Sequence, residues 1–276
     1  MAMVRLLILD VEGVIALPGG SQHPWPLETM LRLRSVLAAA PYACGLCTGR
    51  QEPYGEAIVQ ALSLFRPLPD DVRKRVRAAG GPPLVSWPSI LENGAYFYDP
   101  VAKTPYAHPA LTPEWIETIQ RVRAEAIQPL VRETGALLEA GKDFSLSLNP
   151  PLLDPGTGER QSTAEFRPRV EAAVAPLADV VEVKHSLSAI DITPRGVSKA
   201  SAVRLLLEWT GLAPEEVLGV GDTAADEAWL QVVGHRAAPA NGRPFLRDLH
   251  YYADAEVVEG LLQILQRLEG NGYAGL

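Results

Sequence analysis

The feature that most constrains this chain is a short apolar run that ends in two acids. Leu6 to Leu9 is followed directly by Asp10-Val11-Glu12-Gly13. Four apolar residues are too few for a helix and predict a strand buried on both faces, as in a parallel sheet. Open α/β sheets bind ligands beyond the carboxyl ends of their strands. The acids therefore mark a candidate site, whereas the alternative is a strand that simply ends in solvated acids.

A second acidic cluster follows a second apolar run. Val217 to Val220 precedes Gly221-Asp222-Thr223-Ala224-Ala225-Asp226. Because the carboxyl ends of parallel strands share one edge of a sheet, Asp10, Asp222 and Asp226 are expected to meet there. Three carboxylates repel one another unless a cation lies among them, and oxygen ligands of this kind favour Mg²⁺.

The same segment also fits a second pattern. Gly219 to Ala224 reads Gly-x-Gly-x-x-Ala, a weak dinucleotide-binding signature. Asp222 would then face a pyrophosphate, which is electrostatically unfavourable, and no acid follows at the expected distance. A dinucleotide-dependent oxidoreductase is therefore the remote alternative.

Strand and helix patterns alternate along most of the chain. We predict an α/β fold, with a Rossmann-like core built on a parallel sheet and an inserted α+β domain. The core is expected to comprise residues 1–98 and 191–276, and the inserted domain residues 99–190. The elements expected in the core are helices over 27–40, 54–65, 198–209, 224–232, 244–250 and 255–268, strands at 42–47, 217–220 and 237–238, and a hairpin at 90–98. Those expected in the inserted domain are helices over 112–134 and from a capping box at 162–165, and strands at 136–148, with one wet face, 180–184 and 187–192.

Composition limits the classes of partner. The 276 residues carry 25 Lys and Arg against 33 Asp and Glu, a formal net charge of −8. An acidic chain lacks the basic footprint that nucleic acids and anionic membranes require. No apolar stretch approaches the ~18 residues of a membrane span. We therefore expect a cytoplasmic protein with a small-molecule partner, no nucleic acid and no membrane, while the oligomeric state stays open.

The two cysteines form a Cys-x-x-Cys pair, Cys44 and Cys47, within an expected strand. Positions three apart on a strand point to opposite faces, which disfavours a redox pair or half of a zinc site. Two buried structural thiols are the preferred interpretation.

Two further segments supply groups suited to phosphate. Thr48-Gly49-Arg50 offers a hydroxyl and backbone amides at another strand end, and Lys199 begins a helix from which its ammonium can reach the same crevice. Taken singly, such residues are usually ordinary surface residues. The prediction of a phosphate site depends on the order in which these segments and the two acidic clusters occur along the chain.

In this order the four segments resemble the motifs of the haloacid dehalogenase superfamily of phosphatases. They are Asp10-Val11-Glu12-Gly13-Val14, Thr48-Gly49-Arg50, Gly196-Val197-Ser198-Lys199 and Gly221 to Asp226. The flanks of the inserted segment, Ile90 to Ala95 and Asp191 to Lys199, resemble the Cof-like and sugar-phosphatase branch, which has a C2B-type cap. The resemblance covers essentially the whole chain and is specific in the core but loose in the cap.

The resemblance implies a role for each core motif. Asp10 would be the nucleophile that forms an aspartyl-phosphate, and Glu12 would be the general acid/base. Mg²⁺ would be held by Asp10, the backbone carbonyl of Glu12 and Asp222, with Asp226 in support. Thr48 and Lys199 would bind the transferring phosphoryl group.

Backbone and side-chain groups around these motifs would complete the substrate site. Gly13, Gly49 and Arg50 are the candidates beside the phosphate, and Lys142 and Lys184 are cap candidates that could recognise sugar hydroxyls or a second anionic group. The expected reaction is Mg²⁺-dependent hydrolysis of a small phosphomonoester, such as a sugar or glyceryl phosphate. The alternatives are a sugar phosphomutase and a phospho-ligand-binding protein with weakened catalysis.

Two positions depart from the usual pattern. Glu12 stands where the superfamily commonly has Asp, although enolase-phosphatases resemble this chain in carrying Glu there. Ala225 stands where this branch commonly has Asn beside the second acid. The first departure affects the reach of the acid/base group, and the second should weaken support of the cation ligands rather than remove one.

Overall fold

The computed structural model describes residues 3–17, 24–151, 153, 158, 161–186 and 189–276. The chain divides into two compact units, unit 1 (Met1–Tyr106 and Lys199–Leu276) and unit 2 (Ala107–Ser198). Each boundary lies eight residues beyond the position predicted from the sequence, at 106/107 rather than 98/99 and at 198/199 rather than 190/191. One reason is that β5 (Thr104–Ala107) continues the small sheet of unit 1, and another is that Arg195 N donates to Val180 O within unit 2.

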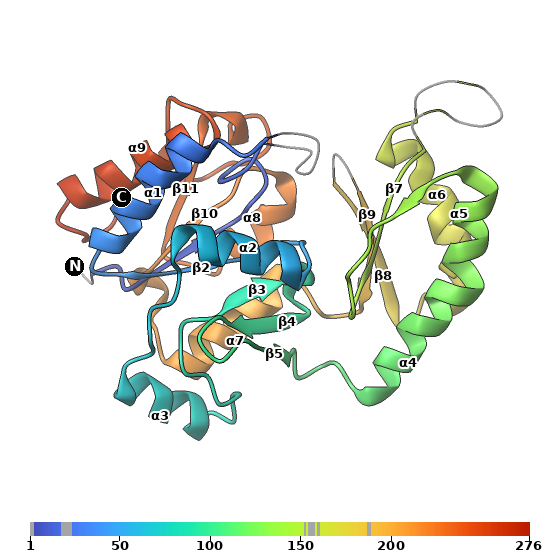
Figure 1. Cartoon of the computed structure of the whole chain (residues 1–276), viewed down its shortest axis with the longest axis horizontal. Helices are drawn as coiled ribbons and strands as arrows, with labels where there is room; N and C mark the ends of the chain where they lie inside the picture. Colours follow the sequence, from blue (N-terminus) through green and yellow to red (C-terminus); the bar gives the residue numbers. More distant parts are fainter. Residues whose placement is uncertain (1–2, 18–23, 152, 154–157, 159–160, 187–188) are drawn as a thin grey trace. The chain divides into compact units, whose positions relative to one another are not determined.

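A five-stranded parallel sheet forms the centre of unit 1 (Figure 1). Its order is β12-β11-β10-β1-β2, namely Tyr251–Tyr252, His235–Ala238, Val217–Val220, Leu6–Leu9 and Ala43–Leu46. Leu9, the last residue of β1, lies beside Val220 on one side and Leu46 on the other. The segments that follow these three strands therefore leave the sheet at the same edge. This confirms the predicted α/β fold with a parallel sheet.

Alternate residues of β1 enter two hydrophobic cores, one on each face of the sheet. Leu7 and Leu9 belong to the core that helices α1, α2 and α9 cover, and Leu6 and Ile8 belong to the core under α3, α7 and α8. The helices of the first core are α1 (Leu27–Ala39), α2 (Glu52–Leu62) and α9 (Val257–Gly270), and those of the second are α3 (Asp70–Ala78), α7 (Lys199–Thr210) and α8 (Ala224–Leu230).

The two cysteines also lie on opposite sides of the sheet. Cys44 is buried in the first core and Cys47 in the second, and both thiols are free. Burial raises the pKa of both thiols well above the ordinary value. The interpretation as buried structural thiols is confirmed.

Unit 2 contains a four-stranded antiparallel sheet with helices packed on it. The strand order is β6-β7-β9-β8, namely Leu137–Leu138, Leu146–Asn149, Ile190–Pro194 and Val181–His185. Its helices are α4 (Pro113–Arg121), a π-helical segment (Val122–Ile127), α5 (Gln128–Thr134) and α6 (Thr163–Val174). The capping box of α6 is formed as predicted, with Glu165 N donating to Ser162 Oγ at 3.2 Å.

Two local predictions are wrong. The segment 136–148 is expected to be a strand with one wet face, but it forms the two strands β6 and β7, and Ser147 is fully buried because it bonds to Lys142 and Asp191. Residues 244–250 were expected to be helical, but they form turns after the 3₁₀ segment Ala240–Gly242. The edge strand β12 follows these turns.

The other short elements are a small sheet of β3 (Ser89–Leu91), β4 (Tyr96–Asp99) and β5 with a 3₁₀ turn at Glu92–Gly94, and the 3₁₀ segments Ala175–Leu177 and Pro214–Glu216. Among the described residues, no helix combines the length and the apolar character that crossing a membrane requires.

Candidate active site

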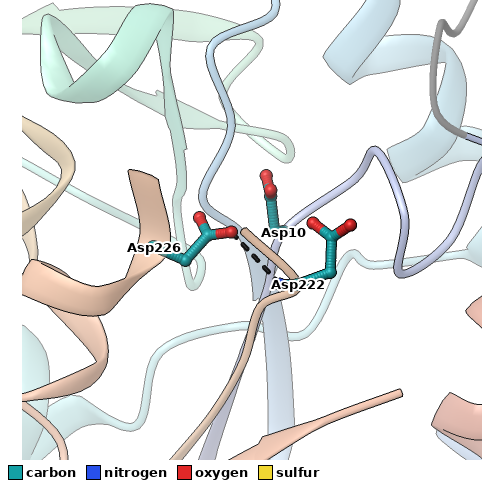
Figure 2. A group of neighbouring side chains, drawn as sticks. All are labelled: Asp10, Asp222 and Asp226. Atoms are coloured by element: carbon teal, nitrogen blue, oxygen red, sulfur yellow. Dashed lines mark hydrogen bonds between the residues drawn. The ribbon is translucent and has the colours of Figure 1, made fainter. Parts of the chain in front are cut away.

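Three aspartates meet at the carboxyl edge of the parallel sheet. Asp10 follows β1, Asp222 follows β10 and Asp226 lies in the first turn of α8 (Figure 2). One carboxylate oxygen from each lies within 4.8 Å of the others, and all three residues are buried. Asp226 Oδ2 also accepts hydrogen bonds from the backbone N of Asp222 at 3.2 Å and of Thr223 at 3.1 Å. Asp226 thereby holds the loop that carries Asp222.

Lys199, the first residue of α7, supplies the positive charge nearest to these acids. Its Nζ lies 2.8 Å from Asp226 Oδ1 and 3.0 Å from Asp10 Oδ1. The residue is only 9% exposed, so its ammonium has lost most of its contact with water. Such a buried cation persists because carboxylates surround it.

The acids differ in the direction of their pKa shifts. Burial, then the neighbouring Asp226, raises the pKa of Asp10 well above its ordinary value, although Lys199 opposes this. Burial and Asp226 likewise raise the pKa of Asp222 to about 7. Burial would also raise the pKa of Asp226, but Lys199 and the hydrogen bonds to Asp226 hold it below its ordinary value.

The pKa of Lys199 follows the same balance of forces. Burial opposes the charged ammonium, but Asp10 and Asp226 outweigh it and raise the pKa of Lys199 well above its ordinary value. The Lys199 and Asp226 pair is therefore ionised, and Asp10 and Asp222 are the carboxyls whose charged forms lack sufficient compensating charge.

A bound divalent cation would compensate the charged forms of Asp10 and Asp222. Oδ1 of Asp222 is buried and accepts no hydrogen bond from any residue that the structure describes, and the buried Oδ1 of Asp10 has the Lys199 ammonium as its neighbour at 3.0 Å. A buried carboxylate oxygen without a donor is costly, and oxygen donors of this kind are the ligands that Mg²⁺ prefers. The donor set is thus compatible with Mg²⁺ between Asp10 and Asp222.

Glu12 is held by the segment that follows β2. Its carboxylate makes an ion pair with Arg50 through Oε1 and Nε, and Thr48 Oγ1 donates to Oε2 at 3.4 Å. The Arg50 guanidinium also lies over the ring of Tyr54, 5.0 Å from its centroid. Glu12 therefore contributes its side chain to a cluster with Arg50 and Thr48, and only its backbone carbonyl is available for the predicted contact with a cation.

The turn between β3 and β4 supports the Thr48-Gly49-Arg50 segment. The backbone N of Asn93 donates to Thr48 O at 3.0 Å, and that of Glu92 donates to Arg50 O at 3.0 Å. Both donors have positive φ, 57° for Asn93 and 46° for Glu92. A Cβ on Gly49 would lie 2.9 Å from Asn93 Oδ1, so a larger residue would displace the Asn93 side chain.

Gly13 lies directly against the second acid. Its φ is +73°, and a Cβ built on it would lie 1.8 Å from Asp222 Oδ2. The turn after β1 can therefore approach Asp222 only with glycine at this position.

The two lysines predicted in the inserted domain belong to unit 2, where both are paired. Lys142 is 3% exposed, and its Nζ contacts Ser147 Oγ, Glu139 Oε2 at 3.3 Å and Asp191 Oδ1 at 3.5 Å. Lys184 is half exposed, and its Nζ lies 2.7 Å from Glu182 Oε2. Carboxylates of unit 2 thus offset both charges.

Sequence reasoning missed two residues that bond to the acids. Asn241 Nδ2 donates to Asp222 Oδ2 at 3.1 Å and to Gly13 O at 3.0 Å. Trp229 Nε1 donates to Asp226 Oδ1 at 2.9 Å. Asn241 lies in a Pro-Ala-Asn-Gly stretch that reads only as a turn, and Trp229 reads only as a core residue of a helix, so neither gives a local signal.

Comparisons with known proteins show which parts of the chain are similar in sequence to known hydrolases. Residues 157–253 match the sequence model of a family described as haloacid dehalogenase-like hydrolase. A phosphoglycolate phosphatase of Methanothermobacter thermautotrophicus is 35% identical over 91 residues, which are 33% of this chain and 41% of that relative. A phosphoglycolate phosphatase of Staphylothermus marinus is 23% identical over 249 residues, which are 89% of each chain.

Similarity to solved structures extends over nearly the whole chain. A haloacid dehalogenase-like hydrolase from Bacteroides thetaiotaomicron superposes with a TM-score of 0.63 at 15% identity, covering 96% of this chain and 99% of that one. At this identity the likeness concerns the fold alone. The fold includes both the parallel-sheet unit and the antiparallel-sheet unit.

Proposed function

We propose that this chain, whose residues 157–253 match the haloacid dehalogenase-like hydrolase model, is a hydrolase of that family, and we propose a reaction and a substrate class for it. We infer that it is a phosphatase that hydrolyses small phosphate monoesters with the help of Mg²⁺. The observation that carries the proposal is the grouping of Asp10, Asp222, Asp226 and Lys199 at one edge of the sheet. A carboxylate nucleophile, a cation site and a buried ammonium are parts suited to phosphoryl transfer through an aspartyl-phosphate.

Asp10 is the proposed nucleophile. One of its carboxylate oxygens attacks phosphorus, the P–O bond to the leaving group breaks, and an aspartyl-phosphate forms. Lys199, 3.0 Å from Asp10 Oδ1, neutralises charge on the phosphoryl oxygens as they approach. The Thr48 hydroxyl, at the end of the neighbouring strand, is the further group proposed to bind the phosphoryl oxygens.

Asp10, the carbonyl of Glu12 and Asp222 are the residues proposed to hold Mg²⁺, with Asp226 supporting the loop of Asp222. When bound, Mg²⁺ supplies positive charge that lets an anionic nucleophile approach an anionic ester.

Glu12 is the proposed general acid and base. It gives a proton to the leaving oxygen in the first step and takes one from the water that hydrolyses the aspartyl-phosphate in the second. Water attack releases phosphate and restores Asp10. The ion pair with Arg50 and the contact with Thr48 fix the Glu12 carboxylate for this task.

Small phosphorylated metabolites are the proposed substrates, with sugar, glyceryl and glycolyl phosphates as the first candidates. The phosphoglycolate phosphatases among the relatives support the glycolyl phosphate, and unit 2 is proposed as the cap domain. Lys142 and Lys184 stay candidates for substrate contact, although unit 2 carboxylates already pair with both. A location in the cytoplasm also stays a prediction.

The test is phosphate release from these phosphates and from an aryl phosphate, with Mg²⁺ and with a chelator. We expect Mg²⁺-dependent release from the wild type and none above background from Asp10→Asn, whose amide cannot act as the nucleophile. Hydrolysis that persists in Asp10→Asn would contradict the proposal. Phosphoryl transfer between sugar positions without net release would instead identify a mutase, and binding without turnover would identify a phospho-ligand-binding protein.

A further inference from the structure

Asn241 connects two segments that carry the acidic site. Its side-chain amide reaches Gly13 O at 3.0 Å, in the turn after β1, and Asp222 Oδ2 at 3.1 Å, in the loop after β10. These segments lie more than two hundred residues apart in sequence. The side chain therefore fixes the distance between the turn that follows Asp10 and the carboxylate of Asp222.

The third contact of Asn241 fixes the side chain itself. Its Oδ1 accepts a hydrogen bond from the backbone N of Val257 at 3.0 Å. Both Nδ2 hydrogens of Asn241 donate a hydrogen bond, and its Oδ1 accepts one. An aspartate here would place a carboxylate against two oxygen acceptors.

The backbone around Val257 is arranged for this contact. Val257 has a φ of +49°, a value that β-branched residues rarely adopt. The preceding segment is tied down, because Ala240 N donates to Ala255 O at 2.9 Å and the backbone N of Ala255 donates to Gln263 Oε1 at 3.1 Å. A strained residue that persists within a well-bonded segment points to a functional constraint.

The hydrogen bond from Asn241 to Asp222 also decides which oxygen of Asp222 is left for a cation. Oδ2 is taken by Asn241, whereas Oδ1 is buried and accepts no hydrogen bond from the described residues. Gly242, the next residue, packs against the same loop, since a Cβ on it would lie 3.2 Å from Asp222 Cα. The 240–242 segment thus holds both the backbone and the carboxylate of Asp222.

We propose that Asn241 is a positioning residue for the cation site: it orients Asp222 and the turn after Asp10 so that Asp222 Oδ1 and the Asp10 carboxylate converge on one divalent ion. This inference rests on the proposed function, and it concerns the site's affinity for the ion. Loss of a side chain that orients metal ligands typically weakens metal binding about 10- to 100-fold.

The test is a Mn²⁺ titration of the full-length protein without substrate. Electron paramagnetic resonance measures the concentration of free Mn²⁺ at each step. Mg²⁺ is then added as a competitor. We expect Asn241→Ala to weaken Mn²⁺ and Mg²⁺ binding about 10- to 100-fold, and activity to recover in part as the Mg²⁺ concentration is raised. Wild-type ion affinity in folded Asn241→Ala overturns the inference, whatever happens to activity.

A matched control separates positioning from general destabilisation. Asn271 makes the same kind of contact, from Nδ2 to Gly275 O at 3.0 Å, in the segment after α9. Asn271→Ala should leave ion affinity unchanged. If Asn241→Ala does not fold, Asn241→Ser is used, because its short hydroxyl side chain cannot span both acceptors; unchanged affinity in that variant also refutes the inference.

A failure of this inference can be told apart from a failure of the proposed function. Hydrolysis that survives in Asp10→Asn would refute the proposed function while the ion titration still reports on Asn241. Conversely, wild-type ion affinity in Asn241→Ala would refute this inference and leave the Asp10 mechanism standing.

Discussion

Replacing Glu12 by Asp tests the most unusual residue of the site. Asp is the residue that the superfamily commonly carries here, so the resemblance alone suggests that the change preserves or raises activity. The structure leads us to expect the opposite. The Glu12 carboxylate is held by Arg50 and Thr48, and a shorter side chain would withdraw from both.

The size of the effect follows from the geometry. Removing one methylene withdraws the carboxylate by about 1.5 Å, the length of one carbon–carbon bond. The contact from Thr48 Oγ1 to Glu12 Oε2 is already 3.4 Å and would be lost. A misplacement of ~1 Å can cost a reacting group ~100-fold in rate, which is about 2.7 kcal/mol of transition-state stabilisation. We therefore expect kcat/KM for an alkyl phosphate to fall about 10- to 100-fold in Glu12→Asp.

The assay compares glycerol phosphate with 4-nitrophenyl phosphate at saturating Mg²⁺. An alkoxide leaving group needs a proton, whereas 4-nitrophenolate leaves without one, so the loss should be larger for glycerol phosphate. Arg50→Gln should show the same preference, because it frees the Glu12 carboxylate from its ion pair. Glu12→Asp with activity equal to or above the wild type on glycerol phosphate would refute the reasoning, as would equal losses on both substrates.

Four further predictions concern stability and the cation site. Lys199→Met should lower the free energy of unfolding in urea by about 3–5 kcal/mol, because it leaves buried carboxylates without their cation; a loss below 1 kcal/mol would contradict the ionised pair. The raised pKa of Asp222, about 7, means that the folded protein retains a proton that the unfolded chain loses above pH ~4. The metal-free protein should therefore have a higher Tm at pH 5.5 than at pH 8, and Mg²⁺ should stabilise it more at pH 8; a Tm that rises with pH over this range would be inconsistent with the shift. Gly13→Ala should lower Mg²⁺-dependent activity ~100-fold by displacing Asp222, whereas Gly270→Ala, with open space at its Cβ, should not change it. Ser162→Ala removes the capping box of α6 and should cost about 1 kcal/mol in urea unfolding, and no measurable loss would argue against the cap.

Local sequence patterns predicted most of the core correctly. Strands β1 and β10 lie where the apolar runs are, because a strand buried on both faces of a parallel sheet needs apolar residues at consecutive positions. The tight turn at Asn93 and Gly94 forms as predicted, since both residues adopt the positive φ that the turn requires.

The errors arise where long-range contacts overrule a local pattern. Ser147 alternates with leucines and reads as the wet side of a strand, but Lys142 and Asp191 bury it in a polar network. The segment 244–250 has helix-like spacing, yet Arg243 bonds to the carbonyl of Ala253 at 3.0 Å and Tyr252 Oη donates to Leu246 O at 2.9 Å. These contacts hold the segment as a chain of turns.

The candidate site also contains features that local sequence predicted and features that only long-range contacts produced. The sequence by itself determined which residue types follow each strand, and parallel pairing then required Asp10 and Asp222 to share one edge. Only the tertiary structure decided that Arg50 holds the Glu12 side chain and that Asn241 links Gly13 to Asp222. The physical reason is that the positions of strands and helices along the chain follow from periodicity and burial, which neighbouring residues encode. Hydrogen bonds between segments depend instead on how packed loops bring distant residues into contact.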